Sequence, residues 1–289
     1  MILSEVYAYG TERLKEVGIE NPSVDSFYLL EYAAKINNTT YLMYKDREVT
    51  DEQFAQYKAL IDERCEHVPY QYITHTADFM GLTFEVNRDV LIPRLDTEVL
   101  GEETVKLLGF KADVLDMCTG SGCIGIALKR YRPDIHVTLS DNSQRALDVA
   151  FKNVAHQHIG LANDTGDMET GIRLVHGNLF SSFEKGTDKF DFIVSNPPYV
   201  SLEEYRNLMP EVKDHEPMNA LLAGEDGLDI IRRLVKESPD YLKTGGTLIF
   251  EIGSKQADKV KPLMEEAGFK DISVIKDLSG LDRVVKGHI

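Results

Sequence analysis

The chain has 289 residues, 43% of them hydrophobic, which is enough for an α/β core and a second, smaller unit. Its 48 acidic and 32 basic residues give a formal net charge of −16. Clustered Lys and Arg are needed to bind nucleic-acid backbones, so this charge disfavours direct nucleic-acid binding and fits a basic protein partner.

The cysteines, the histidines and the hydrophobic pattern exclude further classes of protein, namely disulfide-rich, metal-binding and membrane-spanning proteins. The three cysteines and eight histidines show no metal-ligand spacing, so we expect neither a disulfide framework nor a metal site. No stretch approaches the roughly 18 consecutive apolar residues of a membrane span, and residues 1–6 lack the basic segment of a signal peptide. We expect a cytoplasmic protein with no membrane partner, and a monomer.

Residues 4–67 show helical periodicity throughout, because apolar side chains recur at steps of three and four residues. Thr50 and Gln53 have the spacing of a capping box, with Thr50 as the N-cap of a helix. We therefore predict an N-terminal helical domain over residues 1–70.

The next segment contains short strand-like runs. Tyr72, Phe79 and Phe84 are spaced as in strands, and we predict a linker β-hairpin over residues 71–92. The remaining residues, 93–289, form the second predicted domain.

From residue 105 onward, strand-like and helix-like segments alternate, which is typical of a parallel, doubly wound sheet. The predicted strands lie near residues 112–117, 135–140, 172–176, 190–195 and 245–251. Residues 271–275 and 282–286 flank Ser279-Gly280 and predict an antiparallel hairpin. Such a hairpin, added to a parallel sheet, is typical of methyltransferases that use this architecture.

A glycine-rich turn follows the first predicted strand of the sheet. Gly120, Gly122 and Gly125 match Gly-x-Gly-x-x-Gly, and Asp141 lies about 20 residues further on, at the end of the second strand. On pattern alone this is a dinucleotide-binding fingerprint, in which Asp141 accepts the ribose hydroxyls.

Electrostatics favours a different nucleotide ligand. Asp116 stands immediately before the glycine loop, where its carboxylate would repel a diphosphate. The same carboxylate would attract a ligand that carries an ammonium group and a sulfonium, as S-adenosylmethionine does. Asp141 fits either ligand and does not discriminate between them.

A second motif, Asn196-Pro197-Pro198-Tyr199, ends a later predicted strand. The Asn196 side-chain oxygen and the Pro197 carbonyl are two neighbouring acceptors, which match the two N–H donors of a planar –NH2 group. The prolines stiffen the turn, and Tyr199 offers a flat face for stacking. We therefore predict Asn196, Pro197 and Tyr199 as catalytic residues. A plain strand-ending turn is the alternative for the tetrapeptide alone.

The two motifs strengthen each other. The carboxyl ends of parallel strands converge on one crevice, so Asp116, Asp141 and Asn196 are expected to lie close together. A cofactor that carries a methyl group on sulfur and a site that holds an –NH2 group together predict amine or amide methylation.

Several segments of the chain resemble successive signatures of one family, the HemK-type release factor glutamine-N5 methyltransferases. The segments are Phe79-Met-Gly-Leu82, Ile92-Pro-Arg-Leu-Asp-Thr-Glu98, Asn196-Pro-Pro-Tyr199, Glu251-Ile-Gly253 and Gly280-Leu-Asp-Arg-Val-Val285. The resemblance implies a Rossmann-like, class I S-adenosylmethionine-dependent methyltransferase fold. It implies methyl transfer to the side-chain nitrogen of the glutamine in the Gly-Gly-Gln loop of peptide-chain release factors. The helical domain would help to hold that substrate.

The resemblance also places cofactor-binding residues by position. They are Cys118, Thr119, Gly120, Ser121, Gly122, Asp141, Asn178, Leu179 and Asn196. Five positions depart from the family pattern: Asn178 replaces Asp, Cys118 replaces Gly, Leu95-Asp96 replaces Pro-Glu, and His215 replaces Tyr. We expect Asn178 to lower cofactor affinity without changing the chemistry.

Substrate binding is predicted for Asn196-Pro197-Pro198-Tyr199, together with Arg94 and Glu98. Arg94 and Glu98, with His215 and Glu216, either orient the substrate loop or brace one another as a buried polar network. The sequence leaves these two roles open.

Two other functions remain open at this stage. Amine methylation of a nucleic-acid base, of the adenine-N6 type, would use Asn-Pro-Pro-Tyr equally well but needs a base-flipping pocket and a basic track. A binding module that keeps the fold without catalysis is the second alternative, which the intact glycine loop and Asn196 disfavour.

Overall fold

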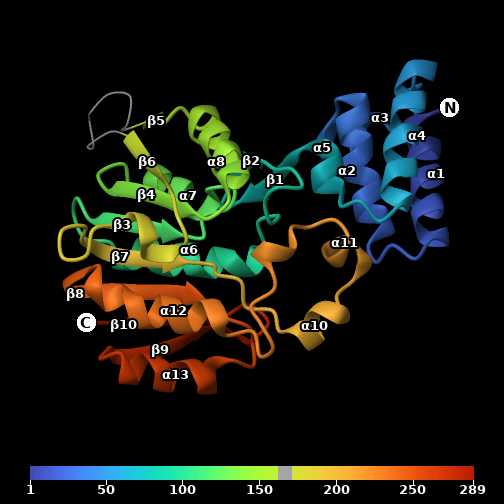
Figure 1. Cartoon of the computed structure of the whole chain (residues 1–289). Helices are drawn as coiled ribbons and strands as arrows, with labels where there is room; N and C mark the ends of the chain where they lie inside the picture. Colours follow the sequence, from blue (N-terminus) through green and yellow to red (C-terminus); the bar gives the residue numbers. More distant parts are fainter. Residues whose placement is uncertain (162–170) are drawn as a thin grey trace. The chain divides into compact units, whose positions relative to one another are not determined.

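The computed structural model describes residues 1–161 and 171–289. The chain divides into two compact units, shown in Figure 1. The first comprises residues 1–76 and 209–215, and the second comprises residues 77–208 and 216–289. A short segment from the middle of the second unit's sequence therefore packs with the N-terminal helices.

The first unit is helical, as the periodicity predicts. Its helices are α1 (Leu3–Glu16), α2 (Pro22–Ala34), α3 (Asn38–Tyr44), α4 (Asp51–Cys65), α5 (Tyr70–Thr74) and α11 (Pro210–Lys213). The capping box at the start of α4 is confirmed, because Thr50 Oγ1 accepts from Gln53 N and Gln53 Oε1 accepts from Thr50 N.

The core of the helical unit contains a buried charge cluster. Arg64 lies on α4, and its Nε donates to Asp25 Oδ2 of α2 at 2.8 Å. The same guanidinium is paired with Glu211 of α11. Burial raises the pKa of Asp25, and the hydrogen bond and charge of Arg64 act against that rise. Arg64 thus fastens the 209–215 segment to the N-terminal helices.

The prediction that Tyr72 lies in a strand was wrong, because Tyr72 is buried in the one-turn helix α5. A helix of five residues is too short to show a helical period in its sequence. The strands begin later, as β1 (Thr76–Phe79) and β2 (Leu82–Glu85), which form a two-stranded sheet.

The second unit is built on an eight-stranded sheet of order β5-β6-β4-β3-β7-β8-β10-β9 (Figure 1). Its strands are β3 (Asp113–Met117), β4 (His136–Asp141), β5 (Gly160–Leu161), β6 (Gly171–His176), β7 (Phe190–Ser195), β8 (Leu242–Glu251), β9 (Lys270–Lys276) and β10 (Asp282–His288). The strands from β5 to β8 pair in parallel, while β10 pairs antiparallel with β8 and β9. The predicted doubly wound sheet with a terminal hairpin is confirmed. The two-residue strand β5 carried no signal in the sequence analysis.

Helices cover both faces of this sheet. The α-helices of the second unit are α6 (Leu95–Leu107), α7 (Cys123–Tyr131), α8 (Gln144–His156), α10 (Leu202–Arg206), α12 (Asp229–Glu237) and α13 (Ala257–Glu266). Short 3₁₀ turns lie at Leu179–Ser182, Met218–Ala220 and Ser238–Asp240. Val114 packs into one hydrophobic cluster with residues of α6, α7 and α8, whereas Leu115 packs into another with α12 and α13. Neighbouring strand residues point to opposite faces, so a strand such as β3, whose buried apolar residues Val114 and Leu115 face opposite ways, needs helices on both faces.

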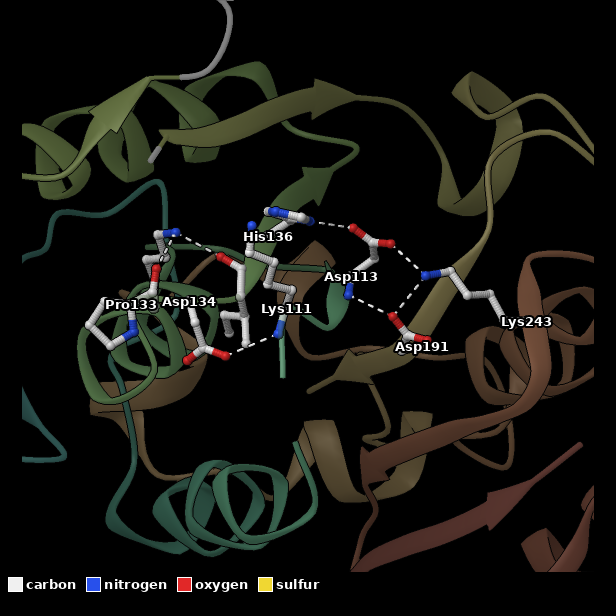
Figure 2. Close-up of polar contacts among 9 residues, drawn as sticks. Lys111, Asp113, Pro133, Asp134, His136, Asp191 and Lys243 are labelled. Atoms are coloured by element: carbon white, nitrogen blue, oxygen red, sulfur yellow. Dashed lines mark hydrogen bonds and ion pairs between the residues drawn. The ribbon is translucent and has the colours of Figure 1, made fainter. Parts of the chain in front are cut away.

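Charged side chains connect the strands at the end of the sheet where the parallel strands begin, which we call the amino edge (Figure 2). Lys243 Nζ of β8 lies 2.5 Å from Asp113 Oδ2 of β3 and 2.8 Å from Asp191 Oδ2 of β7. His136 Nδ1 of β4 lies 2.7 Å from Asp113 Oδ1. These contacts connect four adjacent strands at the ends where they begin. The opposite, carboxyl edge is built differently.

Candidate active site

A cavity lies at the carboxyl edge, beside the ends of β3, β4 and β7. Residues from seven parts of the second unit line it. These are the stretch before α6 with its first turn, the glycine loop with the start of α7, the segment after β4, the turn after β6, the turn after β7, the 3₁₀ turn Met218–Ala220, and α12. The predicted site residues among them are Arg94, Cys118, Thr119, Gly120, Ser121, Asp141, Asn178, Leu179, Asn196 and Pro198. The convergence of strand ends on one crevice is therefore confirmed.

The glycine loop wraps tightly between β3 and α7. Gly120 and Gly122 have φ of +56° and +82°, in the left-handed region that glycine adopts without strain. A Cβ at Gly122 would lie 2.8 Å from Ile126 Cδ1, so the loop admits no side chain there. At Gly120 a Cβ would meet nothing within 4 Å, so this glycine serves the turn and leaves the adjoining space open.

Cys118 also adopts a left-handed conformation, with φ of +60°. For a residue with a Cβ this conformation costs roughly 1–2 kcal/mol relative to the right-handed one. The departure from glycine at this position is therefore a source of local backbone strain. Burial raises the pKa of the Cys118 thiol, so the side chain stays neutral at ordinary pH.

Asp116 does not line the cavity but lies fully buried behind the glycine loop. Its Oδ2 accepts from Thr119 Oγ1 at 2.6 Å and from Gly125 N at 2.9 Å, so the carboxylate fixes the loop from within. Its Oδ1 has no hydrogen-bond partner among residues 1–161 and 171–289. Burial raises the pKa of Asp116 to about 7, against the effect of the two hydrogen bonds.

Asp141 lines the cavity at the end of β4. Gly120 N donates to its Oδ2 at 2.9 Å and Ser143 N donates to its Oδ1 at 2.9 Å. Each oxygen keeps a further lone pair, so the pair can accept from two adjacent hydroxyls, as on a ribose. Burial raises the pKa of Asp141, and the backbone hydrogen bonds oppose that rise.

Asn178 and Leu179 form the wall of the cavity after β6. Asn178 Oδ1 accepts from Arg233 Nη1 of α12 at 2.9 Å. Leu179 is buried and, with Ile230 of α12, gives this part of the wall an apolar surface. A planar, weakly polar group such as adenine fits between such side chains.

Asn196 and Pro198 line the cavity, while Pro197 and Tyr199 are not among the lining residues. Asn196 Nδ2 donates to Thr97 Oγ1 at 3.2 Å. Tyr199 lies behind the wall, where its hydroxyl donates to Glu251 Oε1 at 2.9 Å. Burial raises the pKa of the Tyr199 hydroxyl, and the Glu251 charge raises it further.

The remaining predicted residues are held in ion pairs and backbone contacts. Arg94 lines the cavity and is paired with the buried carboxylate of Glu216. Glu98 does not line the cavity, since its Oε1 accepts from Met80 N at 2.6 Å in the β1–β2 turn. His215 belongs to the helical unit, where its Nε2 lies 3.1 Å from Glu66 O. Of the four residues, Arg94 and Glu216 thus brace each other, whereas Glu98 and His215 bond to backbone groups elsewhere.

Sequence reasoning missed several lining residues. Thr97 follows Arg94 within the Ile-Pro-Arg-x-x-Thr-Glu segment, so a signal for it was present. Asn219, Ala220 and Ile230 also line the cavity, but they come from segments without a motif, and only the folded chain brings them to the wall.

The charged residues that line the cavity indicate whether it fits a diphosphate or a cationic ligand. The charged residues that line it are Asp89, Asp141 and Arg94, and Arg94 is already paired with Glu216. Two carboxylates and one neutralised cation disfavour a diphosphate and favour a cationic ligand. Within the described ranges, no group of His, Cys, Asp and Glu could hold a metal ion, and no helix is long and apolar enough to cross a membrane.

Two family models match the chain. Residues 5–74 match the PrmC N-terminal domain, and residues 88–211 match the methyltransferase small domain. A methyltransferase from Pyrococcus furiosus has a similar fold, with a TM-score of 0.53 and 17% identity, over 81% of this chain and 98% of that one.

Relatives with higher identity span nearly the full length. The release factor glutamine methyltransferase of Clostridium acetobutylicum is 40% identical over 275 residues, which are 94% of this chain and 93% of that protein. The enzyme of the same name from Geobacter sulfurreducens is 38% identical over 276 residues, or 96% and 93% of the two chains. The chain is thus a methyltransferase with the S-adenosylmethionine-dependent fold, and it belongs to the family of release factor glutamine methyltransferases.

Proposed function

We propose that this protein transfers a methyl group from S-adenosylmethionine to the side-chain nitrogen of the glutamine in the Gly-Gly-Gln loop of peptide-chain release factors. The observation that carries the proposal is the position of Asn196 at the cavity wall, beside the glycine loop and Asp141. The names of the full-length relatives support the same substrate.

The cofactor would be held by residues of the cavity wall. Asp141 would accept from the ribose hydroxyls, and Asn178 and Leu179 would lie beside the adenine. The loop from Cys118 to Gly122 would surround the rest of the cofactor, with Asp116 bracing it from behind. When bound, S-adenosylmethionine supplies a methyl group on a positively charged sulfur.

Positioning must do much of the catalytic work. An amide lone pair is delocalised into its carbonyl, with a rotation barrier of about 18–20 kcal/mol in peptide-type amides, so glutamine nitrogen is a poor nucleophile. Asn196 Oδ1 and the Pro197 carbonyl would each accept a hydrogen bond from one N–H of the glutamine side chain. These two bonds would aim the nitrogen at the methyl group. Both oxygens would also stabilise the positive charge that develops on the nitrogen.

The proton must leave the nitrogen during or after transfer. We propose that it passes by way of the Asn196 and Pro197 oxygens to water. Neither oxygen is a strong base, so transfer of the methyl group, which makes the nitrogen acidic, would precede or accompany proton loss.

The helical unit would help to hold the release factor. Its match to the PrmC N-terminal domain supports this role, and the net charge of −16 fits a basic protein substrate. We further propose that the protein acts as a monomer in the cytoplasm. Elution from a size-exclusion column at the mass of a dimer would contradict the monomer.

The direct test is mass spectrometry of a purified, unmethylated release factor after incubation with this protein and S-adenosylmethionine. We expect the Gly-Gly-Gln peptide to gain one methyl group with the wild type and none with Asn196→Ala. No gain with wild-type protein that demonstrably binds the cofactor would refute the proposal and favour the amine of a nucleic-acid base.

A further inference from the structure

Tyr199, the last residue of the Asn-Pro-Pro-Tyr turn, makes its contacts inside the protein and is not among the residues that line the cavity. Its ring is partly buried and packs against the hydrophobic cluster of Leu115, beside α12 and α13. Its hydroxyl donates to Glu251 Oε1 at 2.9 Å, at the end of β8. Glu251 is 1% exposed, and burial strengthens a hydrogen bond to a carboxylate. These contacts support a role for Tyr199 other than stacking on a substrate.

The backbone of Tyr199 is held as well. Gln256 Nε2, just before α13, donates to Tyr199 O at 2.9 Å and to Gly227 O at 3.2 Å. Gln256 Oε1 accepts from Gly253 N at 2.9 Å. A backbone carbonyl only accepts and a backbone N–H only donates, so these partners fix the orientation of the Gln256 carboxamide. Gln256 is 8% exposed, so water competes little for these hydrogen bonds.

The turn that contains Gly227 fits closely against the same carbonyl. Gly227 has φ of +75°, and a Cβ there would lie 2.3 Å from Tyr199 O. A side chain at this position would therefore push the Tyr199 carbonyl away from Gln256. The next residue along the chain is also fixed, because Val200 N donates to Leu221 O at 2.9 Å. Segments distant in sequence thus hold the chain directly after Asn-Pro-Pro.

The two prolines make such outside support necessary. Pro197 and Pro198 have no N–H, so neither residue can donate a backbone hydrogen bond that would fix the turn. The place of the Pro197 carbonyl therefore depends on the residues on either side. Before the turn, the Ser195 hydroxyl donates to Met117 O at 2.6 Å. After the turn, the anchors are those of Tyr199.

We infer that Glu251 and Gln256 are positioning residues that anchor Tyr199, one at its hydroxyl and the other at its carbonyl. Through Tyr199 they fix the places of the Pro197 carbonyl and the Asn196 side chain. The inference rests on the proposed function, in which these two acceptors receive the glutamine –NH2 group. Methyl transfer needs the nitrogen in line with the methyl group, and a misplacement of about 1 Å can cost about 100-fold in rate.

The first test compares Tyr199→Phe with Tyr131→Phe in the full chain. Tyr199→Phe keeps the ring and removes the hydroxyl. Tyr131→Phe is the matched control, because Tyr131 lies in the same unit and its hydroxyl donates to the Met80 carbonyl, also at 2.9 Å. Initial rates of methylation of a release factor, at saturating S-adenosylmethionine, give kcat and KM.

We expect Tyr199→Phe to lower kcat about tenfold, the effect of losing one hydrogen bond to a charged group. KM for the release factor and the cofactor affinity, measured by calorimetry, should stay within about twofold of the wild type, because the interaction acts on the transition state. Tyr131→Phe should match the wild type. Wild-type kcat for Tyr199→Phe would overturn the inference and leave the proposed function intact, and a loss in Tyr199→Leu would then assign the ring a stacking role.

A second test separates positioning from folding. Tyr199→Phe leaves the buried Glu251 Oε1 without this donor, whereas Tyr199→Phe/Glu251→Met removes both partners. The double variant should regain unfolding stability relative to Tyr199→Phe, but its kcat should be no lower than that of the worse single variant and no higher than that of Tyr199→Phe. Recovery of kcat together with stability would reduce the pair to a structural role. Losses of kcat that multiply would show independent effects. Either result would contradict the inference.

The anchor at the Tyr199 carbonyl is tested by Gln256→Glu. This variant keeps an oxygen to accept from Gly253 N and removes the donors to Tyr199 O and Gly227 O. Its kcat should also fall about tenfold, with cofactor affinity unchanged. Wild-type kcat in this variant would show that Gln256 does not position the turn. If the wild type binds the cofactor but methylates no release factor, the proposed function fails and this inference fails with it.

Discussion

Asp113 and Asp116 lie in the same strand, β3, yet their surroundings shift their pKa values in opposite directions. At the amino edge, burial would raise the pKa of Asp113, but Lys243 and His136 outweigh it and the pKa is lowered. At the carboxyl edge, burial raises the pKa of Asp116 to about 7, and no cation from residues 1–161 or 171–289 is bonded to it. The lowered pKa at the amino edge is typical of ion pairs that stabilise a fold, whereas the raised pKa at the carboxyl edge is typical of a ligand site.

The contrast extends beyond these two aspartates. At the amino edge a lysine lies between two carboxylates, so the charges there are paired within the protein. At the carboxyl edge, Asp116 Oδ1 and Glu251 Oε2 are buried without hydrogen-bond partners in the described part of the chain. Buried polar atoms without partners cost free energy, and at the amino edge His136 Nε2 is also such an atom in the described part of the chain, so the two edges differ in how their carboxylates are paired.

The largest expected effect concerns the pH dependence of stability at Asp116. A carboxyl whose folded pKa is raised stabilises the fold below its unfolded pKa, near 3.9, and loses that contribution as pH rises to about 7. We expect the free energy of unfolding to fall over this range by on the order of 4 kcal/mol more in the wild type than in Asp116→Asn.

Asn is a fair replacement there, because its side-chain oxygen can still accept from Thr119 and Gly125. Urea unfolding at pH 3 and pH 8, on either side of the two pKa values, provides the measurement in both proteins. Parallel pH profiles would mean that the pKa of Asp116 is not raised, and the contrast between the two edges would lose its strongest element.

The next effect concerns charge at Asn196, the proposed catalytic residue. Asn196→Asp replaces the donating end of the carboxamide with an acceptor, so Thr97 can no longer receive a hydrogen bond from it. We expect methylation of a release factor to fall about 10²- to 10³-fold, the usual loss when one preorganised electrostatic contact is removed. Single-turnover rates measure the change. A variant as active as the wild type would contradict any role for the neutral amide.

A smaller effect is expected at the amino edge. Lys243→Met leaves Asp113 and Asp191 without their shared cation, and because these groups are partly exposed we expect a loss of only about 1 kcal/mol in unfolding free energy. The folded pKa of Asp113 is lowered, so its stabilising contribution is present above pH 4 and lost below it. The variant should therefore lose less stability than the wild type when the pH falls from 4 to 2.

Denaturant unfolding at pH 7, 4 and 2 would record that change. Methylation activity provides the control, because the amino edge lies at the opposite end of the strands from the cavity. A fall in kcat as large as that of a cavity variant would show that the two edges are not independent.

The smallest effect concerns backbone strain at Cys118. Cys118→Gly removes the Cβ that makes φ of +60° costly, although glycine also gains freedom in the unfolded chain. The net stabilisation should be about 0.5 kcal/mol, seen as a small rise in Tm. A fall in Tm would mean that packing of the thiol outweighs the strain.

Motifs with strict geometry were recognised from the sequence alone. The glycine turn and Asn-Pro-Pro-Tyr require particular residues at fixed spacing, so they were placed at strand ends before the fold was known. Tyr72 was placed wrongly because one helical turn shows no period. Asp116 was expected near the ligand but lies behind the loop, since spacing along a strand does not report which side chain reaches a cavity.

The sequence by itself determined the family and the doubly wound sheet, and it predicted the residues of the candidate site, because local periodicity and motif spacing are properties of neighbours in the chain. Only the tertiary structure brought Asn196 into a hydrogen bond with Thr97, and Tyr199 into one with Glu251, although the partners lie far apart in sequence. It also revealed that residues 209–215 pack with the N-terminal helices. Long-range pairing follows from packing of distant segments, and no local pattern records it.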